Sequence, residues 1–119
     1  MSRVDEIKAD YRRAIEVGEE IRLRRYTGTG PDRPWFDATV RARVMGYEPR
    51  ELINDIKQGD MRVIMLAEDL EAAQVPFPTI SEDLRVFVRD RPCAVLAIDD
   101  NTRRFQGTLI AIEMRVRGQ

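Results

Sequence analysis

The sequence has 119 residues, and its 43% hydrophobic and 34% charged residues are enough for one core and too apolar for a disordered chain. The 20 Lys and Arg residues are balanced by 21 Asp and Glu residues, and this net charge of -1 disfavours a protein that binds nucleic acid by bulk positive charge. No apolar run reaches the roughly 18 residues of a transmembrane helix, and the charged start of the chain is unlike a signal peptide.

Apolar side chains recur at helical spacing in residues 1–18 and predict an amphipathic helix. This stripe consists of Val4, Ile7, Tyr11, Ala14 and Ile15. Ser2 and Asp5 fit a capping box, and Gly18 suits the C-terminal cap. The stripe is longer than the mouth of one small barrel needs, and Tyr is enriched at interfaces. We therefore predict that Val4, Ile7 and Tyr11 dock on a partner as well as on their own domain.

The pattern then changes to the period of two that is typical of strands. Ile21 and Leu23 alternate with arginines, and Arg25 is the expected place of a bulge. Residues 27–34 contain two Gly and two Pro and predict a mobile connection. Residues 36–45 alternate five times and predict a half-buried strand.

Further elements follow the segment 48–60, in which Pro49 can open a short helical turn. The patterns predict a buried strand at 61–66, a short helix at 67–73, and three more strands at 84–88, 93–98 and 110–116. Turns are expected at 89–92 and 99–102, and a bulge is expected at Gly107. The predicted fold is mainly β: a small antiparallel barrel or sandwich of about six strands, an N-terminal helix over 1–18 and one barrel domain over 19–119.

Residue types that carry enzyme chemistry are scarce. There is no His, and Cys93 lies in an apolar stretch where a small buried hydrophobe is the expected role. The acid pairs Glu19/Glu20, Glu68/Asp69 and Asp99/Asp100 lie beside turns or element ends, where hydrated acids are common. We therefore expect no catalytic activity, no cofactor and no metal site.

Arginine accounts for 18 of the 20 basic residues. Six arginines lie on the polar faces of predicted strands: Arg22, Arg24, Arg41, Arg43, Arg115 and Arg117. One interpretation is cross-strand pairing with acids such as Asp37 and Glu113. The other is a basic strip that forms a protein interface or a wall toward nucleic acid. Aromatic residues do not interleave with these arginines in the sequence as a stacking platform for single strands requires.

Four stretches resemble the head-closure proteins of long-tailed double-stranded DNA phages, also called stoppers or head-completion proteins, which occur in prophages and gene transfer agents as well. These stretches are residues 21–26, 36–47, 58–64 and 104–118, and the resemblance extends over residues 20–118. The loop at 27–34 varies greatly in that family, so the resemblance assigns it no role.

The resemblance implies a structural protein of the virion neck, assembled in the bacterial cytoplasm. Such a protein forms a ring of six or twelve copies below the portal and its adaptor, closes the DNA-filled head and provides a docking surface for the tail. The implied partners are other copies of the chain, the portal-bound adaptor, the tail terminator or tail tube proteins, and packaged DNA in the channel.

In such a ring, we predict that residues 48–60 face the channel and help to retain DNA. Their charged side chains are Glu48, Arg50, Glu51, Asp55, Lys57 and Asp60, an acidic excess that would repel DNA more than grip it. The equal alternative is a loop packed on its own barrel by Leu52, Ile53 and Ile56. Two other functions stay open: a tail terminator or similar ring-forming barrel, and a nucleic-acid-binding barrel.

Overall fold

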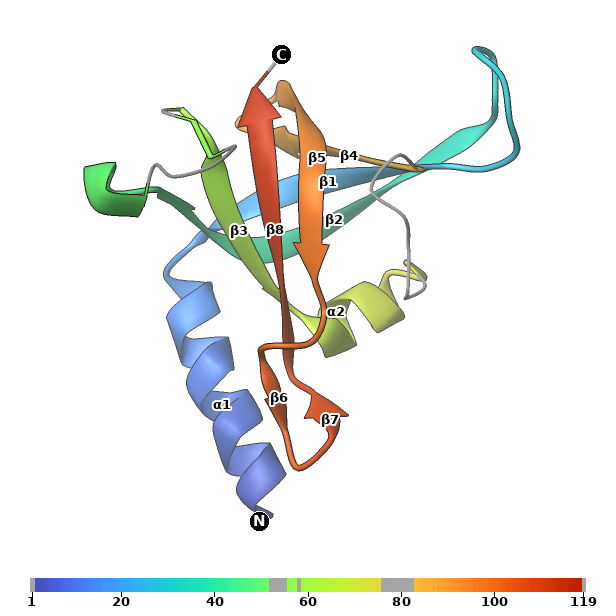
Figure 1. The fold of residues 1–119 in the computed structure, drawn as a ribbon. Coiled ribbons are helices and arrows are strands. Elements are labelled where there is room, and N and C mark those ends of the chain that lie inside the picture. Colours follow the sequence, from blue (N-terminus) through green and yellow to red (C-terminus); the bar gives the residue numbers. More distant parts are fainter. Residues whose placement is uncertain (1, 52–55, 58, 76–82, 119) are drawn as a thin grey trace.

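Six antiparallel strands form a closed barrel, so the predicted mainly β fold is confirmed (Figure 1). The computed structural model describes residues 2–51, 56–57, 59–75 and 83–118. The barrel strands are β1 (Glu19–Tyr26), β2 (Trp35–Gly46), β3 (Met61–Leu66), β4 (Leu84–Val88), β5 (Arg91–Asp99) and β8 (Ala111–Gly118). Their order is β1-β2-β3-β8-β5-β4, and pairing of β4 with β1 closes the barrel.

Alternation along each strand fills the barrel interior. Ile21 on β1 lies opposite Val40 on β2 and Val88 on β4, and all three are buried. The same inward face of the other strands supplies Val63, Met65, Val86, Val95, Ile112, Met114 and Val116. Because successive side chains of a strand point to opposite faces, the arginines between these residues lie on the outside.

The N-terminal helix α1 (Arg3–Glu16) begins as the sequence predicts, since the Ser2 hydroxyl accepts a hydrogen bond from the Asp5 backbone N–H at 3.1 Å. Its end differs from the prediction. Val17 is the C-cap residue, and Gly18 is not in the left-handed conformation. A Cβ at Gly18 would lie 2.0 Å from the carbonyl oxygen of Ala42, so close approach to β2 is what requires glycine there.

One end of the barrel carries helical and hairpin elements, and we call it the helical end. The short helix α2 (Ala67–Ala72) lies across this end and adds Leu70 to the barrel core (Figure 1). The small hairpin of β6 (Arg104–Phe105) and β7 (Thr108–Leu109) projects below it. Gly107 is therefore the second residue of a hairpin turn with φ +79°, and the predicted bulge at this position is wrong.

Three further details depart from the sequence predictions or refine them. Pairing of β1 with β2 runs without a shift through Arg25, so the bulge expected there is absent, and the irregularity lies in β5 between Val95 and Ala97. The turn between β4 and β5 is only two residues long, because Arg89 and Asp90 both have positive φ. The 3-10 turn η1 (Pro49–Glu51) confirms the helical turn at Pro49.

No helix in the described part of the chain is long and apolar enough to cross a membrane.

Candidate functional site

The arginines of β1 pair with an acid on the neighbouring strand. Arg24 donates two hydrogen bonds to the Asp37 carboxylate, at 2.8 and 3.1 Å, and Arg22 lies 3.4 Å from the same group. The hydrogen bonds from Arg24 lower the pKa of Asp37, so this carboxylate stays charged. Cross-strand pairing, the first of the two interpretations of the sequence, therefore describes this part of the arginine set.

Two aromatic rings on the neighbouring strands contact these arginines, although aromatic residues do not interleave with them in the sequence. The Arg22 guanidinium lies 4.2 Å from the centre of the Phe87 ring, and Arg24 lies 3.7 Å from that of Trp35. Phe87 reaches this face because barrel closure pairs β4 with β1 and places it opposite Arg22. The guanidinium groups occupy these ring faces, while Trp35 keeps 51% of its surface exposed.

The remaining arginines of the predicted strip serve other contacts. Arg41 donates hydrogen bonds to the backbone carbonyls of Glu16 and Gly18 at 3.1 Å, which ties the end of α1 to β2. The Nε of Arg43 lies 3.4 Å from the sulfur of Met45. Arg115 and Arg117 are on β8, which β3 separates from β2. The six arginines therefore do not merge into one strip on adjacent strands.

A chain of polar contacts links α1 to the outer wall of the barrel. The Arg103 guanidinium donates to the Tyr11 hydroxyl at 3.1 Å and to the Glu113 carboxylate at 2.8 Å. Arg62 lies 3.3 Å from both Glu113 and Glu51. The Tyr11 hydroxyl is thus hydrogen-bonded within its own chain, and this residue of the apolar stripe is half-buried. The other two predicted docking residues, Val4 and Ile7, are also half-buried.

Three acids of the segment 48–60 form contacts within the molecule, and the first is Glu48, which lies 2.9 Å from Arg50. Glu51 accepts a hydrogen bond from the Glu48 backbone N–H at 2.8 Å, and this bond lowers the Glu51 pKa. Asp60 is 2% exposed and accepts two hydrogen bonds from Arg117, at 2.7 and 2.9 Å. Of the charged residues predicted to face a channel, the exposed ones are Glu48, Arg50 and Lys57. Asp55, like Leu52 and Ile53, lies outside the described residues.

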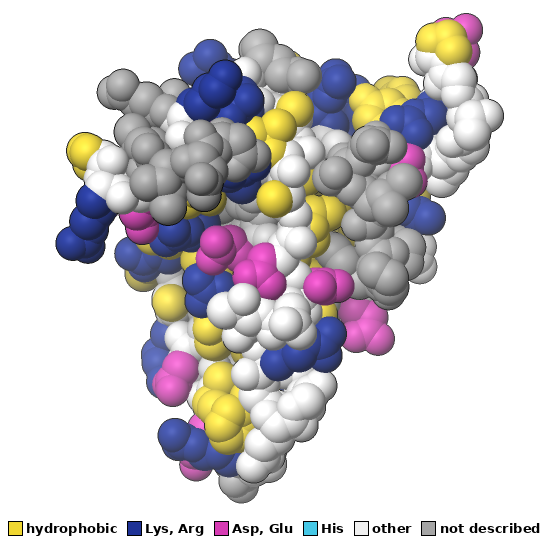
Figure 2. All heavy atoms as spheres, in the orientation of Figure 1, with side chains coloured by type: hydrophobic (Ala, Val, Ile, Leu, Met, Phe, Trp, Pro, Cys, Tyr) yellow, Lys and Arg dark blue, Asp and Glu magenta, His cyan; other side chains and the backbone are white. Residues whose placement is uncertain are grey.

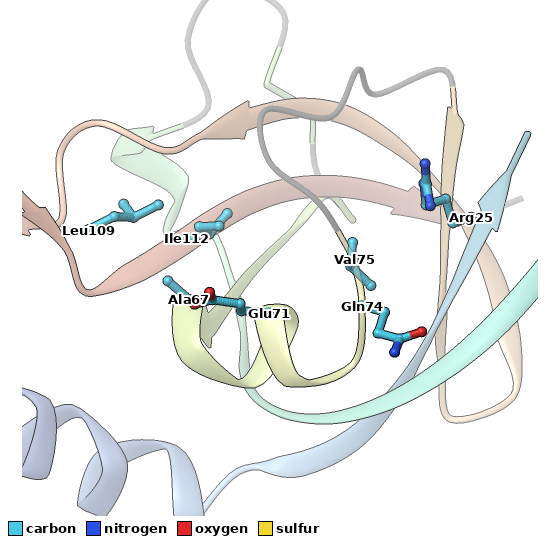
Figure 3. Close-up of a pocket in the computed structure, with 7 residues that line it drawn as sticks. All are labelled: Arg25, Ala67, Glu71, Gln74, Val75, Leu109 and Ile112. Carbon is cyan, nitrogen blue, oxygen red and sulfur yellow. The ribbon is translucent and has the colours of Figure 1, made fainter.

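A hollow of about 560 Å³ lies at the helical end. Figure 3 shows the residues that line it: Arg25, Ala67, Glu71, Gln74, Val75, Leu109 and Ile112. Residues 76–82, which follow Val75 directly, lie outside the described part of the chain.

A second hollow, of about 530 Å³, lies at the opposite end of the barrel, where β3 begins and β8 ends (Figure 1). We call it the basic mouth, and its side chains come from Lys57, Met61, Val88, Arg89, Arg91, Cys93 and Arg117. Cys93 is a free, buried thiol whose pKa is raised by burial, as suits the small hydrophobe that the sequence predicts.

Among the residues that the structure describes, no group of three or more acids, Cys or His is placed to hold a metal ion. No family model matches the chain. No curated protein matches it either.

Proposed function

We propose that the protein is a structural subunit of a virion neck, which forms a ring beneath the portal and adaptor, closes the filled head and receives the tail. One observation supports this proposal most. The stretches 21–26, 36–47, 58–64 and 104–118, which resemble head-closure proteins, fall on β1, β2, β3 and β8, and the last also contains the β6–β7 hairpin. These are four consecutive neighbours in the barrel, so the resemblance follows one continuous wall.

A closed barrel suits a ring subunit because each barrel strand is paired on both sides. Subunits can then meet through side chains and loops without adding strands to one another. The chain offers such contacts at both ends: the α1 tip and the β6–β7 hairpin at one, and η1 with the β4–β5 turn at the other (Figure 1). Neighbouring rings of a neck would engage these two ends.

In this proposal, the half-buried stripe of Val4, Ile7 and Tyr11 is the docking surface of the α1 tip. Glu48, Arg50 and Lys57 are the exposed charges of the segment that we assign to the channel. Glu51 and Asp60 hold that segment on the barrel through Arg62 and Arg117. The segment is thereby anchored at both of its described ends.

A tail terminator, which is another ring-forming barrel, is the second candidate, and the same closed barrel favours it. A free nucleic-acid-binding barrel has less support. The Arg22 and Arg24 guanidinium groups are paired with Asp37 and stacked on Phe87 and Trp35. Phosphates would have to compete with both kinds of contact.

Cryo-electron microscopy of phage-like particles from the producing cells tests the proposal. We expect a ring of six-stranded barrels of this topology between the portal-bound adaptor and the tail. A ring at the top of the tail tube, beyond the head-closure position, would identify the tail terminator instead. Particles whose neck is complete without this chain would contradict both assignments.

A further inference from the structure

The basic mouth combines an apolar floor with a rim of positive charge. We call its buried or half-buried apolar residues, Met61, Val88 and Cys93, the floor, and its basic residues, Lys57, Arg89, Arg91 and Arg117, the rim. Its volume of about 530 Å³ falls within the range of pockets that bind ligands. Figure 2 shows Lys and Arg side chains at this upper end of the barrel, and basic and acidic side chains mixed over the rest of the face.

Acidic side chains neutralise only some of the cations on the rim. Arg117 is paired with the buried Asp60 at 2.7 Å, and Arg89 is paired with Glu19 at the same distance. Lys57 and Arg91 are exposed and form no ion pair with any acid in the described part of the chain. The rim of the hollow therefore carries two cations that a partner's carboxylates could neutralise.

The local fold sets the positions of these groups. The two-residue turn at Arg89 and Asp90 joins β4 to β5, and Arg91 is the first residue of β5, two residues before Cys93. The Arg117 guanidinium donates two hydrogen bonds to the Asp60 carboxylate, which fix its position. The mouth is thus built largely on strand ends, which hold its charges more firmly than a long loop would.

We propose that the basic mouth binds an acidic segment of a partner protein, in which an apolar side chain enters the hollow and flanking carboxylates meet Lys57 and Arg91. The apolar floor favours such a peptide over DNA, because a duplex presents a convex row of phosphates and no apolar side chain for Met61, Val88 and Cys93. The inference goes beyond the neck function, since it concerns any partner that carries such a segment.

Fluorescence anisotropy with a labelled peptide, Glu-Glu-Leu-Asp-Glu, tests this inference on the full chain. We expect saturable binding that weakens with added salt, and roughly tenfold weaker binding for each of Lys57→Glu and Arg91→Glu. The matched control is Arg13→Glu, an exposed charge on α1, which leaves the affinity unchanged. Replacing the peptide's Leu with Ser should also weaken binding, because the apolar floor then loses its contact.

Thermal unfolding of each variant separates lost binding from lost folding, and we expect unchanged midpoints for Lys57→Glu and Arg91→Glu. Absence of binding by the Leu peptide would overturn the proposal. Equal binding of the Leu and Ser peptides would also overturn it, and so would binding that Arg13→Glu weakens as much as Arg91→Glu does. Competition by a short DNA duplex at equal concentration would identify a phosphate site in place of a peptide site.

Discussion

At the helical end of the barrel, Arg12 and Arg103 each reach an acid on another element, whereas at the basic mouth Lys57 and Arg91 reach none of the described acids. Arg12 joins α1 to Glu68 and Asp69 in the first turn of α2. Ion pairs between elements stabilise the fold, whereas charged side chains that pair with no acid at a concave surface are available to a partner. The two ends should therefore respond differently to mutation, the first mainly in stability and the second mainly in binding.

Truncation of Leu70 should have the largest effect on stability. This α2 side chain is fully buried in the barrel core at the helical end. Leu70→Ala removes apolar contacts and leaves a cavity, so we expect a loss of about 3 kcal/mol in the free energy of unfolding. Urea denaturation measures it, with the exposed Glu71→Ala on the same helix as the control. A loss for Leu70→Ala no greater than that for the control would show that α2 does not close the barrel.

Asp60 lies at the basic mouth but should affect stability rather than binding, because it is buried and holds Arg117. Asp60→Asn should cost about 2 kcal/mol, since it leaves Arg117 without its carboxylate while part of the cation stays hydrated. The matched control is Asp90→Asn on the exposed turn. If both variants unfold at the same urea concentration, Asp60 does not stabilise this end.

The same pair predicts a pH dependence. The hydrogen bonds from Arg117 lower the pKa of Asp60 below its unfolded value of about 3.9. A lowered acid pKa adds stability that is fully present above the unfolded pKa and is lost as the pH falls through the folded pKa. The stability gap between wild type and Asp60→Asn should therefore be constant near neutral pH and narrow below about pH 4. A gap that stays constant down to pH 2.5 would contradict this.

The ion pairs between α1 and α2 should have a smaller effect. Arg12→Ala removes contacts to both Glu68 and Asp69, and we expect a loss of about 1 kcal/mol that shrinks at high salt. Arg13 offers the matched comparison, since among the described residues its ion pair is with Asp10, one helical turn away. Arg13→Ala should cost about 0.3 kcal/mol. Equal losses for the two variants would mean that Arg12 does not join the helices.

The strand pattern was predictable from sequence because alternation is a local property. Val40 and Ala42 on β2 are buried as their spacing indicates. The long-range partners were not predictable. Phe87 meets Arg22 only because β4 closes the barrel against β1, and the partners of Arg12 lie 56 and 57 residues away.

The burial of Asp60 was also missed, because an acid after Gly59 is usually a hydrated turn residue. Its one sequence signal was its place directly before the buried strand β3. The basic mouth had no signal of its own. Lys57, Arg91 and Arg117 come from three separate segments, and only the barrel brings their ends together.

A small effect on stability is expected at the cations of the mouth that pair with no described acid. The double variant Lys57→Ala/Arg91→Ala should change the free energy of unfolding by no more than about 0.5 kcal/mol, because neither side chain pairs with a described acid. Urea denaturation beside Arg12→Ala provides the comparison. A larger loss for the double variant would show that the mouth stabilises the fold as the helical end does.

Deletion of the gene from the particle-producing strain tests the neck function most directly. We predict heads that package DNA and then lose it, together with separate, complete tails, when the lysate is examined by electron microscopy. Expression of the wild-type chain from a plasmid should restore joined, DNA-filled particles. Normal numbers of tailed, filled particles in the deletion strain would contradict a role in head closure.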